Sequence, residues 1–433
     1  MSQSLAMLKV LIFFVQLISL TQAKPSSGSR SLVIYDKRLT DLDDYSIFFS
    51  NLEERSYHLD YAPVSNGSAV VELFSGEEKL YDNLIVFPVK SRHFNKQLPA
   101  ERLLDFFNDG GEILVMTSPN GVADNIRIFL NQLGIYPSPR NYELKDYFHV
   151  DDNGLVRLSG NDVLNQHVVP KSDQDVLYEG SAALLGSSDL IIPVLHAPRT
   201  SFTEDVQKQG DKWTVGSQGY VMASFQSLRN SRLTWVGSDS FFSNKYSAPN
   251  QQFAQELIKW TFDEKSVVKA VLSRHSHSNG LEYADSPYKI KDEVVYDIGL
   301  TEWNGASWVP FIADDIQFEL RMVDPYYRIT LKPKYSPSEV QMYTTGNFNL
   351  PDHHGIFTFI VGYKRSGLSF FTEKDVKAIR HLANDEYSRS WDITNSWVYL
   401  TAIYSVIIVW VVFVALFMGI KRKSLVPIEK KTN

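Results

Sequence analysis

The most constraining feature of the sequence is an uninterrupted apolar segment near its carboxyl end. Residues 397–420 (WVYLTAIYSVIIVWVVFVALFMGI) contain no charged side chain. As an α-helix rising about 1.5 Å per residue, the segment would be roughly 36 Å long, enough to cross about 30 Å of hydrocarbon. A buried core helix is the alternative, but buried helices of this length rarely lack every polar anchor. The segment therefore predicts one transmembrane helix.

The charges that flank this segment predict its orientation. The basic run Lys421–Lys423 follows it directly, whereas Glu386, Arg389 and Asp392 lie before it. Basic residues beside a membrane span stay on the cytosolic side, so residues 421–433 are expected to form a cytosolic tail. Nearly all of the chain then lies on the other side of the membrane, as in a single-pass type I protein.

Both ends of the chain carry features that indicate the endoplasmic reticulum. Residues 1–23 match a secretory signal peptide, with an apolar run over Val10–Leu20 and the small residue Ala23 at the cleavage position. Lys430 and Lys431 stand fourth and third from the carboxyl terminus. That spacing resembles the dilysine retrieval signal, an address that a receptor reads. We therefore expect a protein of the endoplasmic reticulum membrane with its bulk in the lumen.

Composition excludes several classes of protein. A chain of 433 residues with 44% hydrophobic content has material for more than one core. The net charge of -7, with no basic stripe, gives no reason to expect nucleic-acid binding. The absence of cysteine excludes a thiol nucleophile, disulfide exchange and cysteine metal sites. The sequon at Asn66 predicts a glycan on a luminal loop.

The first luminal part, residues 24–264, alternates short apolar strands with amphipathic helices. Strands are expected over Ser31–Tyr35, Leu84–Pro88, Glu112–Thr117, Leu190–Leu195, Tyr220–Phe225 and Leu233–Gly237. Helices are expected after the capping residue Asp41 and over Pro99–Asn108, Asn120–Leu133 and Asn250–Phe262. Continuous apolar strands separated by such helices predict an α/β fold with an open, mostly parallel sheet.

The pattern changes near Lys265. Residues 265–390 contain strand-like runs separated by turn signals, among them Glu293–Leu300, Ile316–Val323, Arg328–Leu331 and Ile356–Val361. This arrangement predicts an antiparallel β-sandwich of immunoglobulin-like size between the α/β domain and the membrane. A short helix over Glu373–Asn384 is expected to lead into the transmembrane segment.

Open α/β sheets bind ligands at the carboxyl ends of their strands, so a catalytic site is expected there if the chain has one. These ends present Asp36, Lys90, Ser118 and Asp239. The first strand leads into no glycine-rich loop that could cradle a phosphate, and the sequence holds no Gly-x-Ser-x-Gly nucleophile motif. We expect no catalytic residue and no bound cofactor.

Metal-binding and sugar-stacking candidates are weak. The acidic pairs Asp41/Asp43 and Asp173/Asp175 match the loose Asp-x-Asp pattern of metal-dependent sugar transferases, which often arises by chance. The histidine pairs His275/His277 and His353/His354 have no carboxylate at metal-site spacing. Solvated loops are the better expectation for the histidines. Trp303 and Trp308 could stack on sugar rings, but core packing is the commoner role of tryptophan in a sandwich. No metal site is expected.

Several long, irregular strings carry a resemblance to a known family. They are RSLVIYD (30–36), DNLIVFP (82–88), FLNQLGIYPSPR (129–140), APRTSF (197–202), DDIQFELRMVDPYYR (314–328) and DVKAIRHLANDEYSRSWDITNSWVY (375–399). They resemble the single-span accessory subunit of oligosaccharyltransferase (dolichyl-diphosphooligosaccharide–protein glycosyltransferase). This family includes the yeast wheat-germ-agglutinin-binding protein and animal DDOST, and a fungal member is expected.

The resemblance implies a non-catalytic, structurally required subunit of a complex in the endoplasmic reticulum. That complex transfers a preassembled oligosaccharide from dolichyl diphosphate to Asn in Asn-x-Ser/Thr sequons, with its chemistry on a separate multispanning catalytic subunit. The family's α/β domain resembles a glutamine amidotransferase that lacks the catalytic cysteine. Other implied partners are a ribophorin-II-like subunit and a small DAD-type subunit. Trp397, Tyr404 and Trp410 are the expected contacts with partner helices in the membrane.

Two other classes of function stay open. A luminal enzyme acting alone on glycans would need a ligand crevice around Asp36, Ser118 and Asp239. A luminal glycan-binding receptor that recycles through its dilysine tail would need a saturable sugar site with aromatic side chains at the contact.

Overall fold

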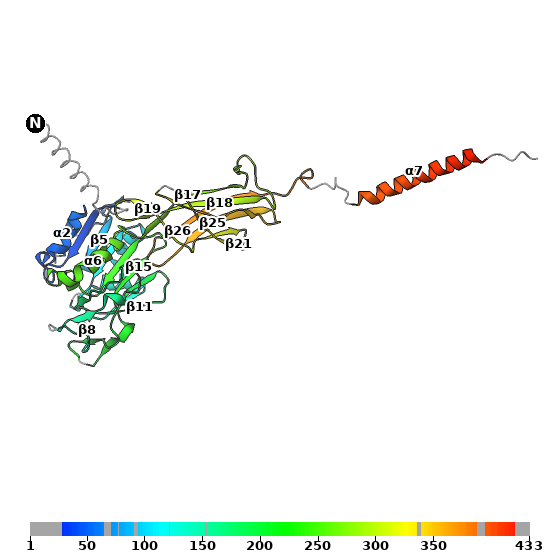
Figure 1. Ribbon diagram of the computed structural model, residues 1–433. Coiled ribbons are helices and arrows are strands. Elements are labelled where there is room, and N and C mark those ends of the chain that lie inside the picture. Colours follow the sequence, from blue (N-terminus) through cyan, green and yellow to red (C-terminus); the bar gives the residue numbers. More distant parts are fainter. Residues whose placement is uncertain are drawn as a thin grey trace, which may run out of the picture. The chain divides into compact units, whose positions relative to one another are not determined.

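The computed structural model of the chain describes residues 28–64, 71–76, 78–90, 94–120, 122–151, 154–208, 210–335, 339–387 and 395–420. They belong to two compact units, Met1–Ile379 and Arg380–Asn433 (Figure 1). The expected signal peptide, the sequon at Asn66, the tail 421–433 and its Lys430 and Lys431 all lie outside the described residues, and they stay predictions.

A nine-stranded mixed sheet forms the centre of the α/β domain. Its parallel half runs β2 (His58–Pro63), β1 (Arg30–Tyr35), β5 (Asn83–Val86), β6 (Glu112–Met116) and β16 (Arg232–Val236). Its antiparallel half contains β15 (Tyr220–Gln226), β12 (Ile191–His196), β11 (Ala183–Leu185) and β7 (Ile135–Pro137). The α/β fold is thus confirmed, with every expected strand found to within two residues. The sheet is less parallel than expected because a short turn joins β15 to β16, and short turns join only antiparallel strands.

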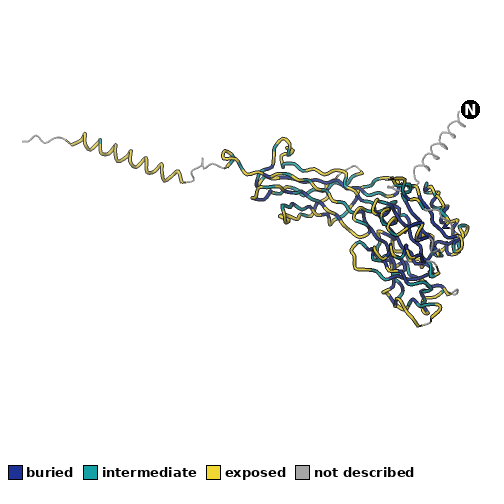
Figure 2. The backbone as a smooth tube through the Cα atoms, turned by 180° about the vertical axis from the view of Figure 1, so that it is seen from behind, coloured by how far each residue is buried: buried dark blue, intermediate teal, exposed yellow. Residues whose placement is uncertain are grey.

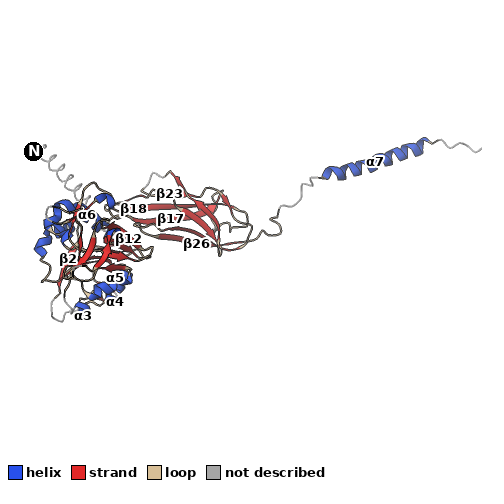
Figure 3. Cartoon of the chain, turned by 90° about the horizontal axis from the view of Figure 1, so that it is seen from below, coloured by secondary structure: helices blue, strands red, loops and turns tan. Residues whose placement is uncertain are grey.

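Helices cover both faces of this sheet, as Figure 3 shows. Since side chains alternate along a strand, Val33 and Tyr35 of β1 face α2 (Ser46–Glu54) and α6 (Ser247–Thr261). Leu32 and Ile34 face the other way, toward α4 (Ala100–Asn108) and α5 (Asp124–Gln132). Strands β5, β6 and β16 are buried along their whole length, which explains their continuous apolar sequences (Figure 2).

The helix ends follow local chemistry. Asp41 accepts a hydrogen bond from the Asp43 backbone N–H at 3.3 Å and so caps the 3-10 helix η1 (Leu42–Tyr45), which leads into α2. Gly110, with φ of +82°, ends α4 as expected. α5 begins at Asp124 rather than at Asn120, because the backbone of Ala123 is still extended.

Smaller elements fill the stretches that the sequence left irregular. Between β7 and β15, β8 (Tyr142–Lys145), β13 (Phe202–Asp205) and β14 (Lys212–Val215) form one sheet, and β9 (Val156–Leu158) pairs with β10 (Val176–Tyr178). The hairpin β3 (Phe74–Ser75)–β4 (Glu78–Lys79) and α3 (Phe94–Gln97) lie nearer the amino end. The remaining 3-10 turns are η2 (Gly160–Asp162), η3 (Gly216–Gln218), η4 (Ser240–Phe242) and η5 (Asn244–Tyr246).

The second part of this unit is the expected β-sandwich, with antiparallel strands throughout. One sheet contains β17 (Val267–His277), β18 (Glu293–Trp303), β19 (Trp308–Pro310), β22 (Lys332–Lys334), β23 (Gln341–Thr344) and β24 (Phe348–Asn349). The other contains β20 (Gln317–Arg321), β21 (Pro325–Thr330), β25 (Gly355–Tyr363) and β26 (Phe371–Ile379). Aromatic contacts join the two sheets, with ring centroids 4.8 Å apart for Tyr296 and Phe318.

The helix expected over Glu373–Asn384 is wrong. Residues 371–379 form β26, which pairs with β25 in nine consecutive positions. The side chains of β26 alternate between half-buried and exposed, which is the two-residue period of a strand. A helix leading into the transmembrane segment was expected here, but pairing with β25 determines the structure.

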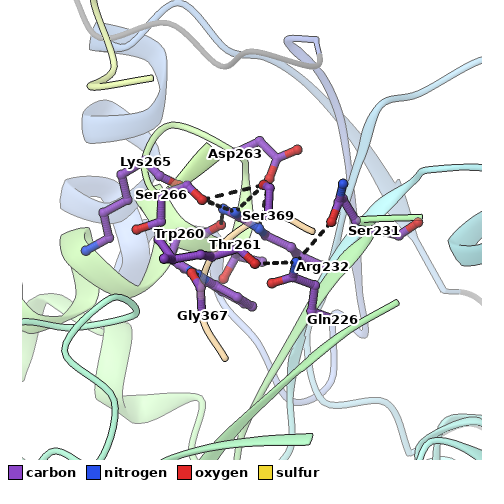
Figure 4. A network of polar contacts seen from close by, with 12 residues as sticks. Gln226, Ser231, Arg232, Trp260, Thr261, Asp263, Lys265, Ser266, Gly367 and Ser369 are labelled. Atoms are coloured by element: carbon purple, nitrogen blue, oxygen red, sulfur yellow. Dashed lines mark hydrogen bonds and ion pairs between the residues drawn. The ribbon is translucent and has the colours of Figure 1, made fainter. Parts of the chain in front are cut away.

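A buried arginine joins the sandwich to the α/β domain (Figure 4). Arg232, fully buried on β16, donates hydrogen bonds to the carbonyls of Trp260, Lys265 and Ser266 at 2.8–2.9 Å and forms an ion pair with Asp263 at 3.0 Å. The same guanidinium donates to Ser369 Oγ at 3.0 Å, in the loop between β25 and β26. One side chain thus connects the sheet, the domain linker and the sandwich.

The second unit contains α7 (Ser396–Gly419), a helix of 24 residues with a mean hydropathy of 2.6 over its most apolar window. Among the described residues it is the one helix long and apolar enough to cross a membrane. Its bounds differ from the predicted segment by one residue at each end.

We predict that Arg232→Ala lowers the free energy of unfolding by about 3–5 kcal/mol, because Asp263 and several carbonyls lose their buried partner. Urea unfolding of the detergent-purified chain, followed by tryptophan fluorescence, measures the change. Arg229→Ala is the matched control, since this arginine is exposed and, within the described ranges, its side chain donates one hydrogen bond, to the Asn108 carbonyl at 3.4 Å. Equal stability of the two variants would contradict the role given to Arg232.

Candidate functional site

Asp36, at the end of β1, occupies the place where a ligand crevice was expected. Its carboxylate accepts hydrogen bonds from Arg38 Nε at 3.0 Å and Nη2 at 2.9 Å, and from the Lys90 backbone N–H at 3.3 Å. Burial alone would raise the pKa of Asp36, but these hydrogen bonds outweigh it and hold the pKa below its ordinary value. Asp36 therefore ties the ends of β1 and β5 together.

Ser118 and Asp239, in contrast, line a common cavity of about 540 Å³. They follow β6 and β16, which pair in parallel, so their carboxyl ends lie side by side. The rest of the wall comes from β8 and its following loop, with Glu143, Asp146 and Tyr147, and from Glu179 after β10. The sheet thus supplies one half of the cavity and the segment between β7 and β15 supplies the other.

Three of the carboxylates around this cavity already accept hydrogen bonds from hydroxyl groups. Tyr45 donates to Asp239 at 3.3 Å, Tyr246 donates to Glu179 at 2.9 Å, and Thr200 donates to Asp146 at 2.7 Å; these six residues come from distant parts of the chain. Burial raises the pKa of Asp239. Burial also acts to raise the pKa of Asp146, but hydrogen bonds from the Phe148 N–H and the Thr200 hydroxyl lower it overall.

Glu143 differs from the other three. It is half-buried on β8 and lines the cavity, and within the described part of the chain it makes no side-chain hydrogen bond or ion pair. Half-buried carboxylates usually have a partner, because an ion held away from water is costly without one.

Aromatic side chains form two different parts of the site. Tyr178 is buried beneath the cavity and donates to the Ser181 carbonyl at 2.5 Å. Tyr147 lines the mouth and is 75% exposed, with its ring centroid 5.8 Å from that of Phe202. Phe148 is also exposed but does not line the cavity. The cavity therefore combines carboxylates with apolar side chains such as Leu155 and Val156, and it has an aromatic edge.

The acidic pairs do not combine with other ligands. In the described ranges, no group of three or more histidine, aspartate or glutamate residues could hold a metal ion. Asp41 acts as a cap, and Asp173 accepts a hydrogen bond from the Asn161 side chain at 3.1 Å.

The expectation of solvated loops is wrong for one histidine pair. His275 and His277 lie on β17 and pack against the Tyr288 ring, and His275 contacts Tyr288 Oη at 2.7 Å and Asp375 Oδ2 at 2.8 Å. Its Nε2 thus connects β17 to β26, and its Nδ1 connects β17 to the segment between β17 and β18. His353 and His354 are exposed in the loop before β25, as expected.

The remaining candidates lie elsewhere in the molecule. Trp303 and Trp308 pack on each other with centroids 5.3 Å apart, and Lys269 Nζ covers Trp308 at 3.5 Å from its ring centre. Trp397, Tyr404 and Trp410 are exposed on α7. Trp397 and Tyr404, seven residues apart, share a helix face that Trp410 does not share. Their contacts with partner helices stay a prediction.

The sequence did not reveal Glu143, Asp146, Tyr147 and Glu179. They lie between β7 and β15, where short strands carry no strong hydrophobic period. The run KDYFH (145–149), which places aromatic residues between charged ones, was the available signal.

Comparison with known proteins gives a consistent result along the chain. Residues 22–264 match the family model of the OST48 N-terminal domain, and residues 275–421 match that of the OST48 middle domain. The dolichyl-diphosphooligosaccharide–protein glycosyltransferase subunit WBP1 of Saccharomyces cerevisiae is 52% identical over 94% of this chain and 95% of its own length. The 48 kDa subunit of the same enzyme from Drosophila melanogaster is 28% identical over 96% of both chains.

One solved structure has a similar outline. The mmIFT52 N-terminal domain covers 54% of this chain and 97% of its own, with a TM-score of 0.41 and 15% identity. A likeness this weak carries no argument about function.

We predict that Asp36→Asn lowers the free energy of unfolding by about 1–2 kcal/mol at neutral pH, because the hydrogen bonds to a charged acceptor weaken. Since the folded-state pKa of Asp36 is lowered, its contribution is complete above the unfolded pKa of about 3.9. The contribution is then lost as the pH falls through the folded-state pKa. Unfolding curves from pH 7 to pH 3 test this.

Asp43→Asn, an exposed position in η1, should match the unsubstituted chain over the same range. A difference between Asp36→Asn and the unsubstituted chain that stays constant down to pH 3 would contradict the prediction.

Proposed function

The chain belongs to the OST48 family, and from this membership we propose that it acts as a non-catalytic structural subunit of the oligosaccharyltransferase complex. The complex transfers a preassembled oligosaccharide from dolichyl diphosphate to asparagine in Asn-x-Ser/Thr sequons of nascent proteins. As a subunit of this complex, the chain is a protein of the endoplasmic reticulum membrane, and it has complex partners.

The observation that carries a structural role is the reversed amphipathicity of β26. Glu373, Asp375 and Lys377 lie on its half-buried side, where Asp375 contacts His275, and the fourth charged residue, Lys374, lies on its exposed side. Its outward side chains include Val376, which is 56% exposed, beside Ile356 of β25, which is 66% exposed. A strand that faced only water would carry its charged residues outward. Exposed apolar faces of this kind mark protein–protein contacts.

Within this proposal, the chemistry belongs to the multispanning catalytic subunit. The carboxylates at the strand ends support this assignment, since Asp36 is held by Arg38 and Asp239 by Tyr45. A ribophorin-II-like subunit and a DAD-type small subunit are the other proposed partners. Their helices would meet α7 at Trp397, Tyr404 and Trp410, where interhelical contacts replace lipid.

The proposal also sets the orientation and the modifications. Removal of the signal peptide 1–23 leaves two luminal domains, 24–264 and 265–390. The transmembrane span 397–420 comes next. The tail after it lies in the cytosol, because the basic residues 421–423 directly follow the span. Asn66 carries a glycan in the lumen, and Lys430 and Lys431 act as the retrieval signal.

We predict that the protein, captured through an epitope tag in a luminal loop, brings down multispanning partners in stoichiometric amounts. The eluate should transfer dolichol-linked oligosaccharide to a sequon peptide, and the chain expressed alone should not. The tag is placed in a luminal loop because a tag at the carboxyl terminus would mask Lys430 and Lys431. Recovery of a monomer without partners would overturn the proposal and favour the alternative, a glycan-binding receptor that recycles through its dilysine tail.

The apolar face gives a second prediction. The double substitution Ile356→Glu and Val376→Glu should reduce recovery of partners at least about tenfold, because charged side chains would be buried unpaired in the contact. Both positions are exposed in the isolated chain, so its own thermal unfolding should change little.

Leu228→Glu is the control, since this exposed leucine lies in the turn between β15 and β16, away from the face. Full recovery of partners by the double variant would show that this face is not a contact.

A further inference from the structure

The cavity between the ends of β6 and β16 has the size and the chemistry of a ligand site. Its volume of about 540 Å³ falls within the range of roughly 300–1,000 Å³ found for small-molecule sites. Its wall combines carboxylates with an aromatic edge, and nothing in the structural role proposed above requires it.

The carboxylates of this cavity are arranged to accept hydroxyl groups. Asp239, Glu179 and Asp146 each accept one from a protein side chain, at 3.3, 2.9 and 2.7 Å. Glu143 has room to accept in the same way, because it faces the cavity half-buried and has no side-chain partner among the described residues. An ionised carboxylate has two acceptor oxygens. Among side chains, it accepts the strongest hydrogen bonds from neutral hydroxyl groups.

Tyr147 supplies the complementary apolar contact. Its ring stands at the cavity mouth, 75% exposed, and Phe202 supports it from β13. Lys212 Nζ lies 4.3 Å from the centre of the Phe202 ring, which holds the supporting ring in place. An aromatic ring that is fixed but open to solvent is suited to stack against the C–H face of a sugar.

Together these features fit a polyhydroxylated ligand with apolar ring faces. We propose that the cavity binds a neutral oligosaccharide, with Glu143 accepting sugar hydroxyls and Tyr147 stacking on a sugar ring. The inference rests on the function proposed above, and it deepens that function by giving the luminal domain a direct contact with the glycan. The glycan could be met on its lipid carrier or on the polypeptide after transfer.

A basic peptide is the competing class of ligand. Asp239, Glu179 and Asp146 already accept hydrogen bonds from protein hydroxyl groups, so a basic peptide would meet one carboxylate, Glu143, that has no side-chain partner among the described residues. Lys145 also lies in the wall, paired with Glu204 at 3.3 Å, and a positive charge there repels a basic chain. Hydroxyl recognition is therefore favoured, and peptide binding becomes an outcome of the test.

The test uses the purified complex with Tyr147→Ala or Glu143→Gln in this subunit. Assembly and turnover are measured first, so loss of partners would count against the proposed function and not against the cavity. In an assembled complex, each variant should raise KM for the dolichol-linked full-length oligosaccharide about twofold to tenfold with kcat unchanged. The KM for the acceptor peptide should stay the same.

Phe148→Ala is the matched control, because Phe148 is an equally exposed neighbour of Tyr147 that does not line the cavity. A dolichol-linked chitobiose donor, which lacks the distal sugars, serves as the second control and should be insensitive to Tyr147→Ala. If the variants change the inhibition by the glycopeptide product and leave the KM for the donor unchanged, the cavity binds the glycan after its transfer to the polypeptide.

Three results would overturn the inference. In the first, Tyr147→Ala and Glu143→Gln change neither the KM for the donor nor the inhibition by the glycopeptide product, although the complex is assembled and active. Another is a rise in the acceptor-peptide KM alone, which would assign the cavity to the polypeptide. The third is an equal effect of Tyr147→Ala and Phe148→Ala, which would show a general change of the loop.

Discussion

The buried guanidinium of Arg232 is the interaction on which the rest of the α/β domain and the sandwich depends. Its hydrogen bonds reach the end of α6 and the linker at Lys265 and Ser266, and its contact with Ser369 holds the sandwich. Removing such a charge from water is costly, and only a complete set of partners offsets the cost. The two domains therefore cannot separate without exposing an ion that has no equivalent partners elsewhere. This explains why residues up to Ile379 form one compact unit.

The same joint determines which side chains the sandwich presents outward. The loop that it holds also receives hydrogen bonds from Gln226 to Leu368 and from Asn230 to Phe370, and it leads directly into β26. Since side chains alternate along a strand, a shift of one residue would turn Val376 inward and Asp375 outward. Fixing the loop thus fixes the register of β26, the contact of Asp375 with His275, and the apolar outer face.

Sequence reasoning succeeded where one local signal dominates and failed where pairing partners decide. The buried strands β1, β5, β6 and β16 and the helix α7 were predicted because continuous apolar runs leave few alternatives. β26 was mistaken for a helix although its partner β25 was predicted as a strand, because the pairing of the two strands and not the sequence of β26 alone decides its structure. The cavity was half predicted: Ser118 and Asp239 follow recognisable strands, whereas Glu143 and Tyr147 come from short elements whose folding depends on tertiary contacts.

The position of the cavity follows from the mixed topology of the sheet. In an open α/β sheet the ligand lies where the strand order reverses, which here is between β1 and β5. The carboxylate of Asp36, bound by Arg38 and the Lys90 N–H, closes that place. The segment between β7 and β15 instead meets the ends of β6 and β16, so half of the cavity wall lies outside the sheet. Changes in that segment can alter the ligand while the buried strands keep the fold, which separates recognition from stability within one domain.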